Sequence, residues 1–566
     1  MAAQVSDRPS IDYYAPPWRE RWRVVTRGST QMNYANFIDR LVGLYGRRTA
    51  FLLDEPIDYP GFSGDVLSYQ DVGRLVNRMA SALRSLGVNE GDRVGLITMN
   101  RIEMAFCNFA CGKLGAIPVP MNFMLRPSEI EFIVQKAGIE VLVVDPAVYG
   151  GTIKERAAVP SVKRWAMIAT GEPPEGVVAL ADAMAEQPDV LEPVEPASHD
   201  QVALLFFTSG TTGFPKGAML THDAALIGIR THARAGASSP VVKDRLMLAV
   251  MPVAHAAGYA TLLLNLGLGQ PAYLLSKFDP QEIFRQVERL RPTTFAGTPA
   301  MFRMLLDADA EHHDWSSIRV FGGGADVFDD ELVRRVREMG ARRGPGGVKR
   351  LPWFVRGYGM AETNSHLAQT PPFPVGDACC GFVLPPVKYR LIDEDGNDVP
   401  KGKPGELVIK GPNVTTGYWN DPEATEQAFT HDGWFRTADI LRKGKWGMLF
   451  FVGRSNDIIK SGGYKISASE IDQVLVKHPD VEMSATVGIP HPVKGERPFS
   501  AVKMRPGTQT TPEQVLEWLR ERVAPYKCSR GIVPVDDIPM TFSMKPKRID
   551  IRERLIAELP EDVRHG

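Results

Sequence analysis

A short segment rich in hydroxyl and glycine residues, "TSGTTGFPKG", combines the groups that hold a polyphosphate. Backbone N–H groups of glycine-rich turns surround phosphate oxygens, hydroxyls add donors, and a lysine adds a point charge. The P-loop spacing is absent, because the fifth residue after Gly210 is Pro215 and Gly217 is followed by Ala218. An ordinary turn after a strand is the alternative. The residues that we expect to bind phosphate are Thr208, Ser209, Gly210, Thr211, Thr212, Gly213 and Lys216.

Four segments in a fixed order resemble the motifs of the adenylate-forming superfamily: "TSGTTGFPKG", "GYGMAET", "GWFRTADI" and "GRSNDIIKSGGYKIS". That superfamily includes acyl-CoA synthetases, aryl-CoA ligases, firefly-type luciferases and nonribosomal adenylation domains. Four motifs in order are far more specific than one. The resemblance implies a two-step reaction, in which ATP and a carboxylic acid give acyl-AMP and pyrophosphate, and a thiol, usually that of CoA, then takes the acyl group.

The segment "GYGMAET" supplies the candidate metal site. By resemblance, Tyr358 stacks on adenine, Glu362 binds Mg²⁺ and Thr363 lies near the α-phosphate. Mg²⁺ normally takes one or two carboxylates together with phosphate oxygens. Thr208 is the second expected contact on the metal side. The structural alternative for Glu362 is a carboxylate that stabilises a helix N-terminus.

Three further segments resemble the contacts of the superfamily to the nucleoside. Asp439 matches the aspartate that binds both ribose hydroxyls, and a carboxylate can accept from two adjacent hydroxyls. Arg454 matches a second ribose contact; the alternative is a surface arginine beside a linker. The turn "FGGGAD" resembles the adenine-binding turn of the superfamily, although a triple glycine is often only a tight exit from a strand. The candidate contacts in this turn are Gly324, Ala325 and Asp326.

The C-terminal segment "PMTFSMKPKR" departs from the superfamily pattern, because Met544 replaces the customary glycine. Lys545 aligns with the lysine that bridges the substrate carboxylate and the α-phosphate during adenylation, and Lys547 is a competing assignment. The resemblance places a hinge at Asn456, a residue type that adopts unusual backbone angles readily. Rotation about it is expected to replace Lys545 by a second set of residues that admits the pantetheine arm of CoA. That set is Lys460, Ser461, Gly462 and Gly463.

The segment "MPVAHAAGYA" resembles the acyl-pocket motif of the superfamily. His255 is expected to form a pocket wall, with a buried core histidine as the alternative, and Gly297 and Thr298 are expected to line the same pocket. The small residues around His255 suggest space for a medium or long fatty acid, or for a bulkier hydrophobic acid.

Composition favours a soluble protein that acts on small molecules. The chain has 566 residues and a net charge of −1, so a nucleic-acid-binding surface is a poor expectation. Five cysteines without a C-x-x-C pair argue against a disulfide scaffold or a zinc site and favour the cytoplasm. No signal peptide or membrane-spanning segment is predicted. The expected ligands are ATP, Mg²⁺, CoA and a carboxylic acid, and a homodimer is kept open.

Short β-branched segments alternate with helical periodicity over the first 300 residues, which predicts an α/β fold with largely parallel sheets. The strands "RVGLI", "VLVVD" and "ALLFF" belong to this pattern, and the Thr208 loop is expected at the carboxyl end of a parallel strand. A capping box at Ser68 and Asp71 predicts the start of one helix, and Ser469 is expected to open another. Antiparallel strands are predicted from about residue 385. We expect an N-terminal domain over residues 1–453 and a small mobile α+β domain over residues 454–566, with the hinge near 454–457.

Three other functions share parts of this pattern. A stand-alone ligase that loads a carrier protein differs only in its acceptor. A luciferase-like oxygenase shares every motif. A nucleotide-binding homologue with altered chemistry is suggested by Met544 alone, and Lys545, Glu362 and Asp439 oppose it.

Overall fold

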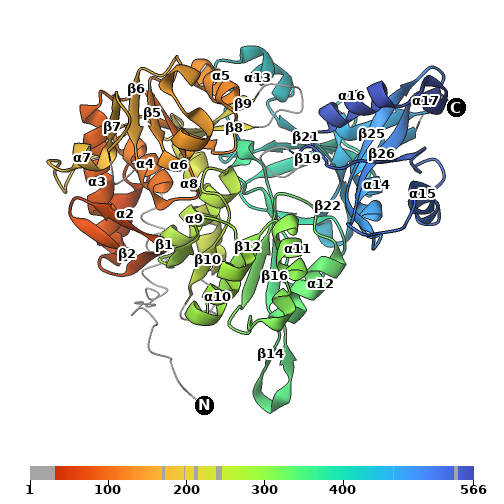
Figure 1. Cartoon of the computed structure of the whole chain (residues 1–566), viewed down its shortest axis with the longest axis horizontal. Coiled ribbons are helices and arrows are strands. Elements are labelled where there is room, and N and C mark those ends of the chain that lie inside the picture. Colours follow the sequence, from red (N-terminus) through yellow and green to blue (C-terminus); the bar gives the residue numbers. More distant parts are fainter. Residues whose placement is uncertain are drawn as a thin grey trace.

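The computed structural model describes residues 32–168, 172–196, 198–208, 215–236, 245–462, 464–540 and 546–565. A large N-terminal body surrounds a 13-stranded and a five-stranded sheet, and a smaller C-terminal unit surrounds another five-stranded sheet (Figure 1). This arrangement confirms the predicted α/β class with a smaller C-terminal domain. Within the described residues, every helix is too short or too polar to cross a bilayer.

The 13-stranded sheet has a parallel centre and antiparallel flanks, in the order β19-β20-β21-β22-β18-β17-β16-β13-β12-β10-β11-β1-β2. The strands from β16 to β1 run parallel, whereas those from β17 to β19 pair antiparallel. The bounds are β1 Thr49–Tyr59, β2 Phe62–Ser68, β10 Met247–Ala249, β11 Ala272–Leu274, β12 Thr294–Gly297, β13 Val320–Gly323, β16 Trp353–Tyr358, β17 Ala368–Gln369, β18 Cys379–Val383, β19 Lys388–Ile392, β20 Pro404–Lys410, β21 Phe435–Lys443 and β22 Leu449–Arg454.

The second sheet of the N-terminal body is wholly parallel, in the order β4-β3-β5-β6-β7. Its strands and the helices nearest to it are β3 Arg93–Thr98, β4 Ile117–Asn122, β5 Val141–Val144, β6 Arg164–Met167, β7 Val177–Ala179, α2 Phe37–Tyr45, α3 Tyr69–Ser85, α4 Ile102–Lys113, α5 Pro127–Ala137, α6 Pro146–Val148 and α7 Leu180–Met184. Ser68 and Asp71 form the predicted capping box at the start of α3.

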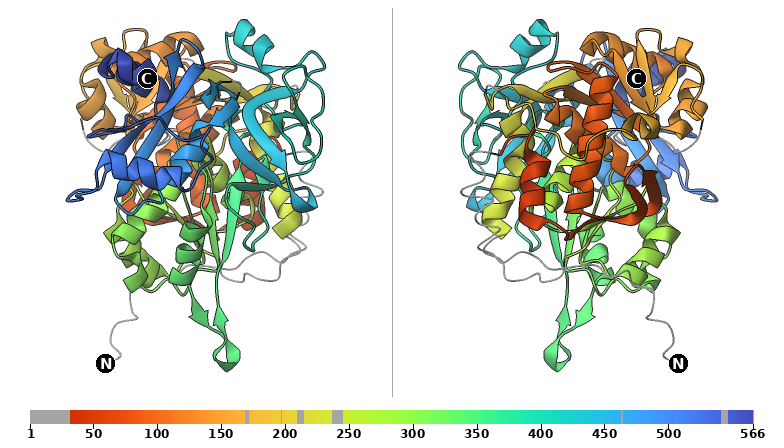
Figure 2. Two further views of the ribbon diagram at one scale, coloured as in Figure 1. Left: turned by 90° about the vertical axis from the view of Figure 1, so that its right-hand side faces the viewer. Right: turned by 90° about the vertical axis from the view of Figure 1, so that its left-hand side faces the viewer.

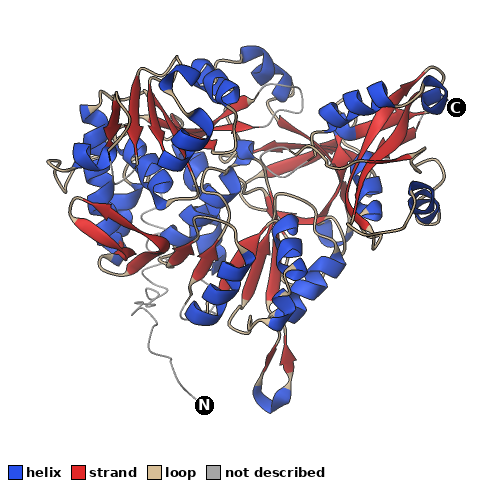
Figure 3. Cartoon of the chain, in the orientation of Figure 1, coloured by secondary structure: helices blue, strands red, loops and turns tan. Residues whose placement is uncertain are grey.

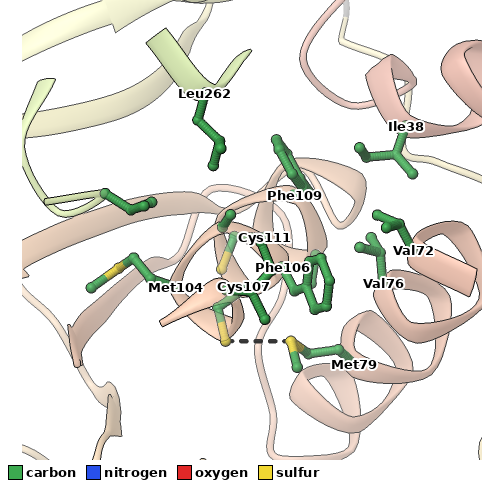
Figure 4. Packing of buried hydrophobic residues seen from close by; sticks show 14 of the residues in the cluster. Ile38, Val72, Val76, Met79, Met104, Phe106, Cys107, Phe109, Cys111 and Leu262 are labelled. Carbon is green, nitrogen blue, oxygen red and sulfur yellow. Dashed lines mark hydrogen bonds between the residues drawn. The ribbon is translucent and has the colours of Figure 1, made fainter. Parts of the chain in front are cut away.

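Helix α4 forms the middle of the core of the N-terminal body, and every one of its residues is buried. Its phenylalanines and cysteines pack against α2, α3 and α9 Ala256–Gly267 (Figure 4). Cys107 lies 3.4 Å from the sulfur of Met79, and burial raises the pKa of the Cys107 thiol well above its usual value. The two cysteines of α4 are therefore inert packing groups, as their spacing in an apolar segment predicts.

One face of the central parallel strands carries an aromatic core that is covered by three helices. These helices are α10 Pro280–Leu290, α11 Pro299–Asp307 and α12 Asp330–Met339, and α8 His222–Gly236 and α13 Pro422–Ala428 lie elsewhere on the body. A hairpin of β14 Arg342–Arg343 and β15 Lys349–Arg350 projects from the body (Figure 2). Short 3₁₀ or π turns lie at Tyr149–Ile153, Arg156–Ala158, Ala310–His312, Pro345–Gly347, Ala361–Thr363 (η5), Lys445–Gly447 and Ser455–Asp457 (η7).

The strand before the phosphate-binding segment is not part of a parallel sheet, which corrects one prediction. β8 Val202–Thr208 pairs antiparallel with β9 Lys216–Thr221, and the two form a separate two-stranded sheet. The register places Thr208 opposite Lys216. The segment between these residues is therefore the loop of a hairpin, and the buried apolar residues of β8 are explained by packing and not by parallel pairing.

The C-terminal unit is an α+β arrangement around the sheet β24-β23-β26-β25, with β27 beside β26 (Figure 3). Its elements are β23 Ile458–Ser461, β24 Tyr464–Ser467, β25 Val481–His491, β26 Gly495–Met504, β27 Ile532–Pro534, α14 Ala468–Leu475, α15 Pro512–Arg520, α16 Arg548–Glu558 and α17 Glu561–His565. Helix α14 is capped by Ser467, two residues before the predicted start at Ser469. β22 belongs to the large sheet and β23 to the small one; the exact domain boundary and its mobility stay predictions.

Candidate active site

A cleft of about 1600 Å³ lies between the N-terminal body and the C-terminal unit. Its walls come from the ends of β8, β9, β13 and β16, from the start of α9, and from β22, β23 and α14. Eight of the residues predicted from the sequence line it: Thr208, Lys216, His255, Gly324, Ala325, Glu362, Arg454 and Lys460. Segments separated by more than 200 residues therefore meet in one cleft.

Tyr358, Asp439 and Arg454 form one connected group beside this cleft. The Tyr358 hydroxyl donates to Oδ2 of Asp439 at 2.6 Å, and Nε of Arg454 lies 3.0 Å from Oδ1. The pairing of β21 with β22 sets Asp439 directly opposite Arg454. The Asp439 carboxylate raises the pKa of Arg454 above its usual value, and burial raises the pKa of Tyr358 well above its usual value. Asp439 is only 2% exposed, so Arg454 and the Tyr358 hydroxyl take the place of water around its carboxylate oxygens.

Glu362 lies in the turn η5, directly after β16, and faces the cleft. The hydroxyl of Tyr418 donates to its Oε1 at 3.0 Å, and its backbone carbonyl accepts from the N–H of Thr415 at 2.7 Å. Burial raises the pKa of the Glu362 carboxyl, although the Tyr418 hydrogen bond and the charge of Arg454 lower it. A partly desolvated carboxylate of this kind is suited to meet a cation.

Tyr418 connects the carboxylate to the hairpin, and sequence reasoning did not predict it. The ring of Tyr418 lies under the ammonium group of Lys216, 5.4 Å from the ring centroid, while its hydroxyl binds Glu362. Ala218 of β9 pairs with Tyr418, which fixes this distance. The only local signal was a tyrosine next to a glycine in "TTGYWN", which is not specific.

Thr208 and Lys216 stand at the two ends of the predicted phosphate loop. The Thr208 hydroxyl donates to the Lys216 carbonyl at 3.4 Å, so the two strands are joined where the loop begins. The predicted phosphate ligands between them, Ser209, Gly210, Thr211, Thr212 and Gly213, lie outside the described residues. The side chains at both ends of the loop thus face the cleft that contains Glu362.

Strained backbone surrounds the site. Ala325, Asn364, Ser365 and Ala438 all have φ between 46° and 69°, a region that costs L-residues roughly 1–2 kcal/mol each. A side chain at Gly324 would meet the Gly357 carbonyl at 2.9 Å, so glycine is needed where β13 and β16 end side by side. Such outliers persist where packing holds a loop in one functional shape. Asp326, the third residue of the predicted adenine turn, is not part of the cleft wall.

The acyl-pocket predictions divide into two outcomes. His255 caps α9, since its ring accepts from the N–H of Ala257 at 3.3 Å, and it lines the cleft. Gly297 and Thr298 do not line the cleft. The Thr298 hydroxyl instead caps α11 by accepting from the N–H of Met301 at 3.3 Å.

The C-terminal unit contributes Lys460 to the cleft wall, whereas Ser461, the last residue of β23, and Gly462, in the turn after it, lie outside that wall. Gly463 and Lys545 lie outside the described residues, and the hinge candidate Asn456 lies in η7. The residues flanking the Lys545 segment are joined, because Met540 pairs with Pro546. The segment therefore leaves and re-enters the fold at one point, next to the start of α16.

An ion-pair network holds the start of α16 within the C-terminal unit, and weaker interactions connect this unit to the N-terminal body. Arg548 lies 2.6 Å from Asp472 and 3.4 Å from Asp457. Burial lowers the pKa of Arg548, but the charges of Asp472 and Asp457, and to a smaller extent that of Asp326 on the N-terminal body, raise it overall. Lys477 and Asp377 add an ion pair of 3.2 Å between the two parts. Arg548 of the C-terminal unit is therefore close enough to Asp326 of the predicted adenine turn to respond to its charge.

The donor set fits a metal that arrives with its nucleotide. Among the described residues, no group of three acidic, histidine or cysteine side chains converges on one point. Glu362 and the Thr208 hydroxyl are two candidate oxygen ligands that line one cleft, and Mg²⁺ commonly completes its shell with phosphate oxygens and water. The cleft can therefore bind a Mg²⁺–polyphosphate complex.

Comparison with known proteins gives consistent results over nearly the whole chain. A family model described as AMP-binding enzyme matches residues 43–419, and one described as AMP-binding enzyme C-terminal domain matches residues 470–545. The chain is 34% identical over 506 residues to a feruloyl-CoA synthase from Amycolatopsis sp, covering 87% of this chain and 94% of that protein. It is 30% identical over 536 residues to a long-chain-fatty-acid–CoA ligase from Thermus thermophilus, covering 93% and 96%. The ATP-bound structure of MatB from Rhodopseudomonas palustris is 27% identical, has a TM-score of 0.79 and covers 93% of this chain and 99% of that chain; the TM-score to its apo structure is 0.68.

Proposed function

Since the chain belongs to the AMP-binding enzyme family, we propose that it activates a hydrophobic carboxylic acid as an acyl-adenylate and transfers the acyl group to CoA. The chain is an AMP-forming acid–thiol ligase, and acyl-CoA ligase activity is common to the relatives it matches. The observation that supports the proposal is that the residues predicted as the metal ligand, the phosphate cation and the acyl-pocket wall line one cleft: Glu362, Lys216 and His255.

The first half-reaction must overcome charge repulsion, because a carboxylate has to approach a polyphosphate. Lys216 and the residues from Thr208 to Gly213 are proposed to hold the β- and γ-phosphates. Glu362 and Thr208 would hold Mg²⁺, which neutralises phosphate charge when it is bound. Lys545 is proposed to meet the α-phosphate, where the carboxylate oxygen forms the new bond and pyrophosphate leaves. Thr363 was expected near the same phosphate, but it is fully buried and its hydroxyl donates to the Met360 carbonyl at 3.1 Å, so its side chain does not reach the cleft in this arrangement.

The nucleoside is proposed to lie over the group of Tyr358, Asp439 and Arg454. The Tyr358 hydroxyl is held by Asp439, so its ring has one fixed orientation for stacking on adenine. Asp439 accepts from the ribose hydroxyls in this account, with Arg454 balancing its charge. Gly324, Ala325 and Asp326 are proposed to approach the adenine edge at the end of β13.

The second half-reaction is proposed to require a rotation of the C-terminal unit about Asn456. In the present arrangement, Arg548 and Lys477 face acidic residues of the N-terminal body, which favours the state that makes the adenylate. The higher similarity to an ATP-bound structure than to its apo form supports this reading. Rotation would remove Lys545 and bring Lys460, Ser461, Gly462 and Gly463 to the bond that CoA attacks. Because all five cysteines are buried free thiols, we propose a reducing compartment, the cytoplasm.

The proposed function predicts that pyrophosphate release depends on the acid. With a panel of fatty, aryl and short polar acids, we expect ATP-dependent pyrophosphate release to be largest for hydrophobic acids, and acyl-CoA to form when CoA is added. The measurement is pyrophosphate release with and without CoA, together with the mass of the thioester. No turnover with any acid would contradict the enzyme reading. If the reaction stops at the adenylate unless a carrier protein is supplied, the carrier protein and not CoA is the acceptor.

A further inference from the structure

The active-site cleft continues along one face of the central sheet, away from the nucleotide site. Side chains alternate along β12, β13 and β16, so that Phe295, Phe321 and Phe354 point into the aromatic core on one face. The residues between them belong to the opposite face and line the cleft. They are small or medium-sized: Thr294, Ala296, Val320, Gly322, Val355 and Gly357.

Helix α9 covers this face of the sheet. Five of its residues, and one directly after it, line the cleft: Ala256, Ala257, Thr261, Leu264, Asn265 and Leu268. Their spacing corresponds to one stripe of a helix. A channel therefore runs between α9 and the strands, with apolar side chains along most of its length.

The channel extends over the full length of the strands. Thr294, Val320 and Trp353 are the first residues of their strands, whereas the nucleotide residues lie at the last residues or beyond. From Val320 to Gly324 the strand advances four residues, or roughly 13 Å. An acid whose carboxylate is held near Glu362 must therefore have a long body to reach the far end.

The far end of the channel is polar. Arg245, Asn265 and Gln270 all line it there. Arg245 stands two residues before the start of β10, and Gln270 stands two residues before the start of β11, so both belong to the amino-terminal edge of the sheet. Asn265 and Gln270 are each only 6% exposed, and the Asn265 amide donates to the Thr261 carbonyl at 2.8 Å. Three polar groups, one of them a permanent cation, thus close a channel that is otherwise mainly apolar.

We propose that this far end, the distal site formed by Arg245, Asn265 and Gln270, binds a second oxygen function on the substrate. The proposal rests on the proposed ligase function and defines its substrate as a long, mainly apolar carboxylic acid with a hydrogen-bond-accepting group at the end remote from the activated carboxylate. An acid that ends in a methyl group offers the donors of the distal site no acceptor, which is unfavourable for polar groups at the closed end of an apolar channel. A carboxylate, hydroxyl or keto oxygen at that end supplies an acceptor.

The test compares matched acids on the purified enzyme and on Arg245→Met. Two series of straight-chain acids of increasing length are used, one ending in methyl and one ending in hydroxyl or carboxylate, and kcat/KM is measured from pyrophosphate release. For chains that reach the distal site, we expect the wild type to prefer the oxygen-terminated acid, and Arg245→Met to reduce that preference roughly 10-fold or more. Arg245→Met should also improve the long methyl-terminated acids, whereas short acids should be unchanged in both proteins.

Controls separate this inference from the proposed function. Arg285→Met removes an arginine on the outer surface of α10, 69% exposed, and should leave the preference unchanged. Gln270→Leu removes a neutral distal group and should lower the same preference if Arg245→Met does not fold. A preference that is identical in wild type, Arg245→Met and Gln270→Leu overturns the distal site while leaving the ligase intact. Absence of turnover with every acid overturns the ligase function itself.

Discussion

Replacing Lys545 with alanine is expected to slow acyl-adenylate formation about 10²- to 10³-fold, the range seen when one donor to a developing anion is removed. The physical reason is that Lys545 is the proposed cation between two anions, the substrate carboxylate and the α-phosphate. Transfer of the acyl group from supplied acyl-AMP to CoA should change little, because Lys545 has left the site by then. The two half-reactions are measured separately, as acid-dependent exchange of labelled pyrophosphate into ATP and as thioester formation from synthetic acyl-AMP.

The matched control for this experiment is Lys547→Ala. Lys547 is the residue directly before α16, where its side chain makes no capping hydrogen bond, and its backbone N–H donates to the Pro539 carbonyl at 2.7 Å. Its backbone is therefore anchored to the fold. We expect Lys547→Ala to retain adenylation. If Lys547→Ala loses the first half-reaction and Lys545→Ala retains it, the alignment of this segment is wrong by two residues. An equal loss of both half-reactions in Lys545→Ala would argue against a rotating C-terminal unit.

Glu362→Gln is expected to lower adenylate formation about 10²-fold or more and, at the same time, to stabilise the protein without ATP. Activity falls because the amide cannot supply the negative charge that a metal–polyphosphate complex needs. Stability rises because burial of the Glu362 carboxylate is unfavourable, as its raised pKa shows, and glutamine keeps an oxygen that accepts from Tyr418. Pyrophosphate exchange measures the loss of activity, and Tm measures the gain in stability.

The pH dependence of this stability difference follows from the direction of the pKa shift. A carboxyl whose pKa is raised in the fold destabilises the protein at pH values above its folded pKa, and the penalty disappears below its unfolded pKa. We therefore expect Glu362→Gln to have the higher Tm at neutral and alkaline pH, with the two proteins converging as the pH falls through the folded pKa. A lower Tm for the variant at pH 8 would show that Glu362 stabilises the fold.

The motifs located most of the cleft because each is a contiguous segment with specific residue types. Glu362, Asp439, Arg454 and Lys216 were found in this way, and the structure brings three of them to the cleft wall, with Asp439 bound behind Arg454. Local signals also predicted helix starts, such as the capping box at Ser68. Roles that depend on bound nucleotide stay predictions, because spacing indicates a ligand type but not its position.

Contacts between distant segments could not be predicted from the sequence. The residues of β8 are buried and apolar, a pattern that is common both to a parallel strand and to one strand of a packed hairpin. The predicted parallel pairing of β8 was therefore wrong, since β8 pairs antiparallel with β9. Tyr418 was missed because its partners lie 56 and 202 residues away. The distal site was missed for the same reason, since Arg245 and Gln270 line one cleft only when β10 pairs with β11 and α9 lies over the sheet. Thr298 was expected to line the acyl pocket, but a threonine before a proline also suits a helix cap, and the structure shows the cap.

The most direct test of the central claim follows the oxygen atoms of the acid. In the proposed first step a carboxylate oxygen bonds to the α-phosphorus and pyrophosphate leaves; in the second step the CoA thiol attacks the carbonyl carbon and that oxygen leaves with AMP. An acid labelled with ¹⁸O in both carboxylate positions should therefore give AMP that contains one ¹⁸O atom, together with unlabelled pyrophosphate. Mass spectrometry of the nucleotide products makes this measurement. AMP without label, or label in phosphate or pyrophosphate, would contradict an acyl-adenylate intermediate and with it the function proposed for this cleft.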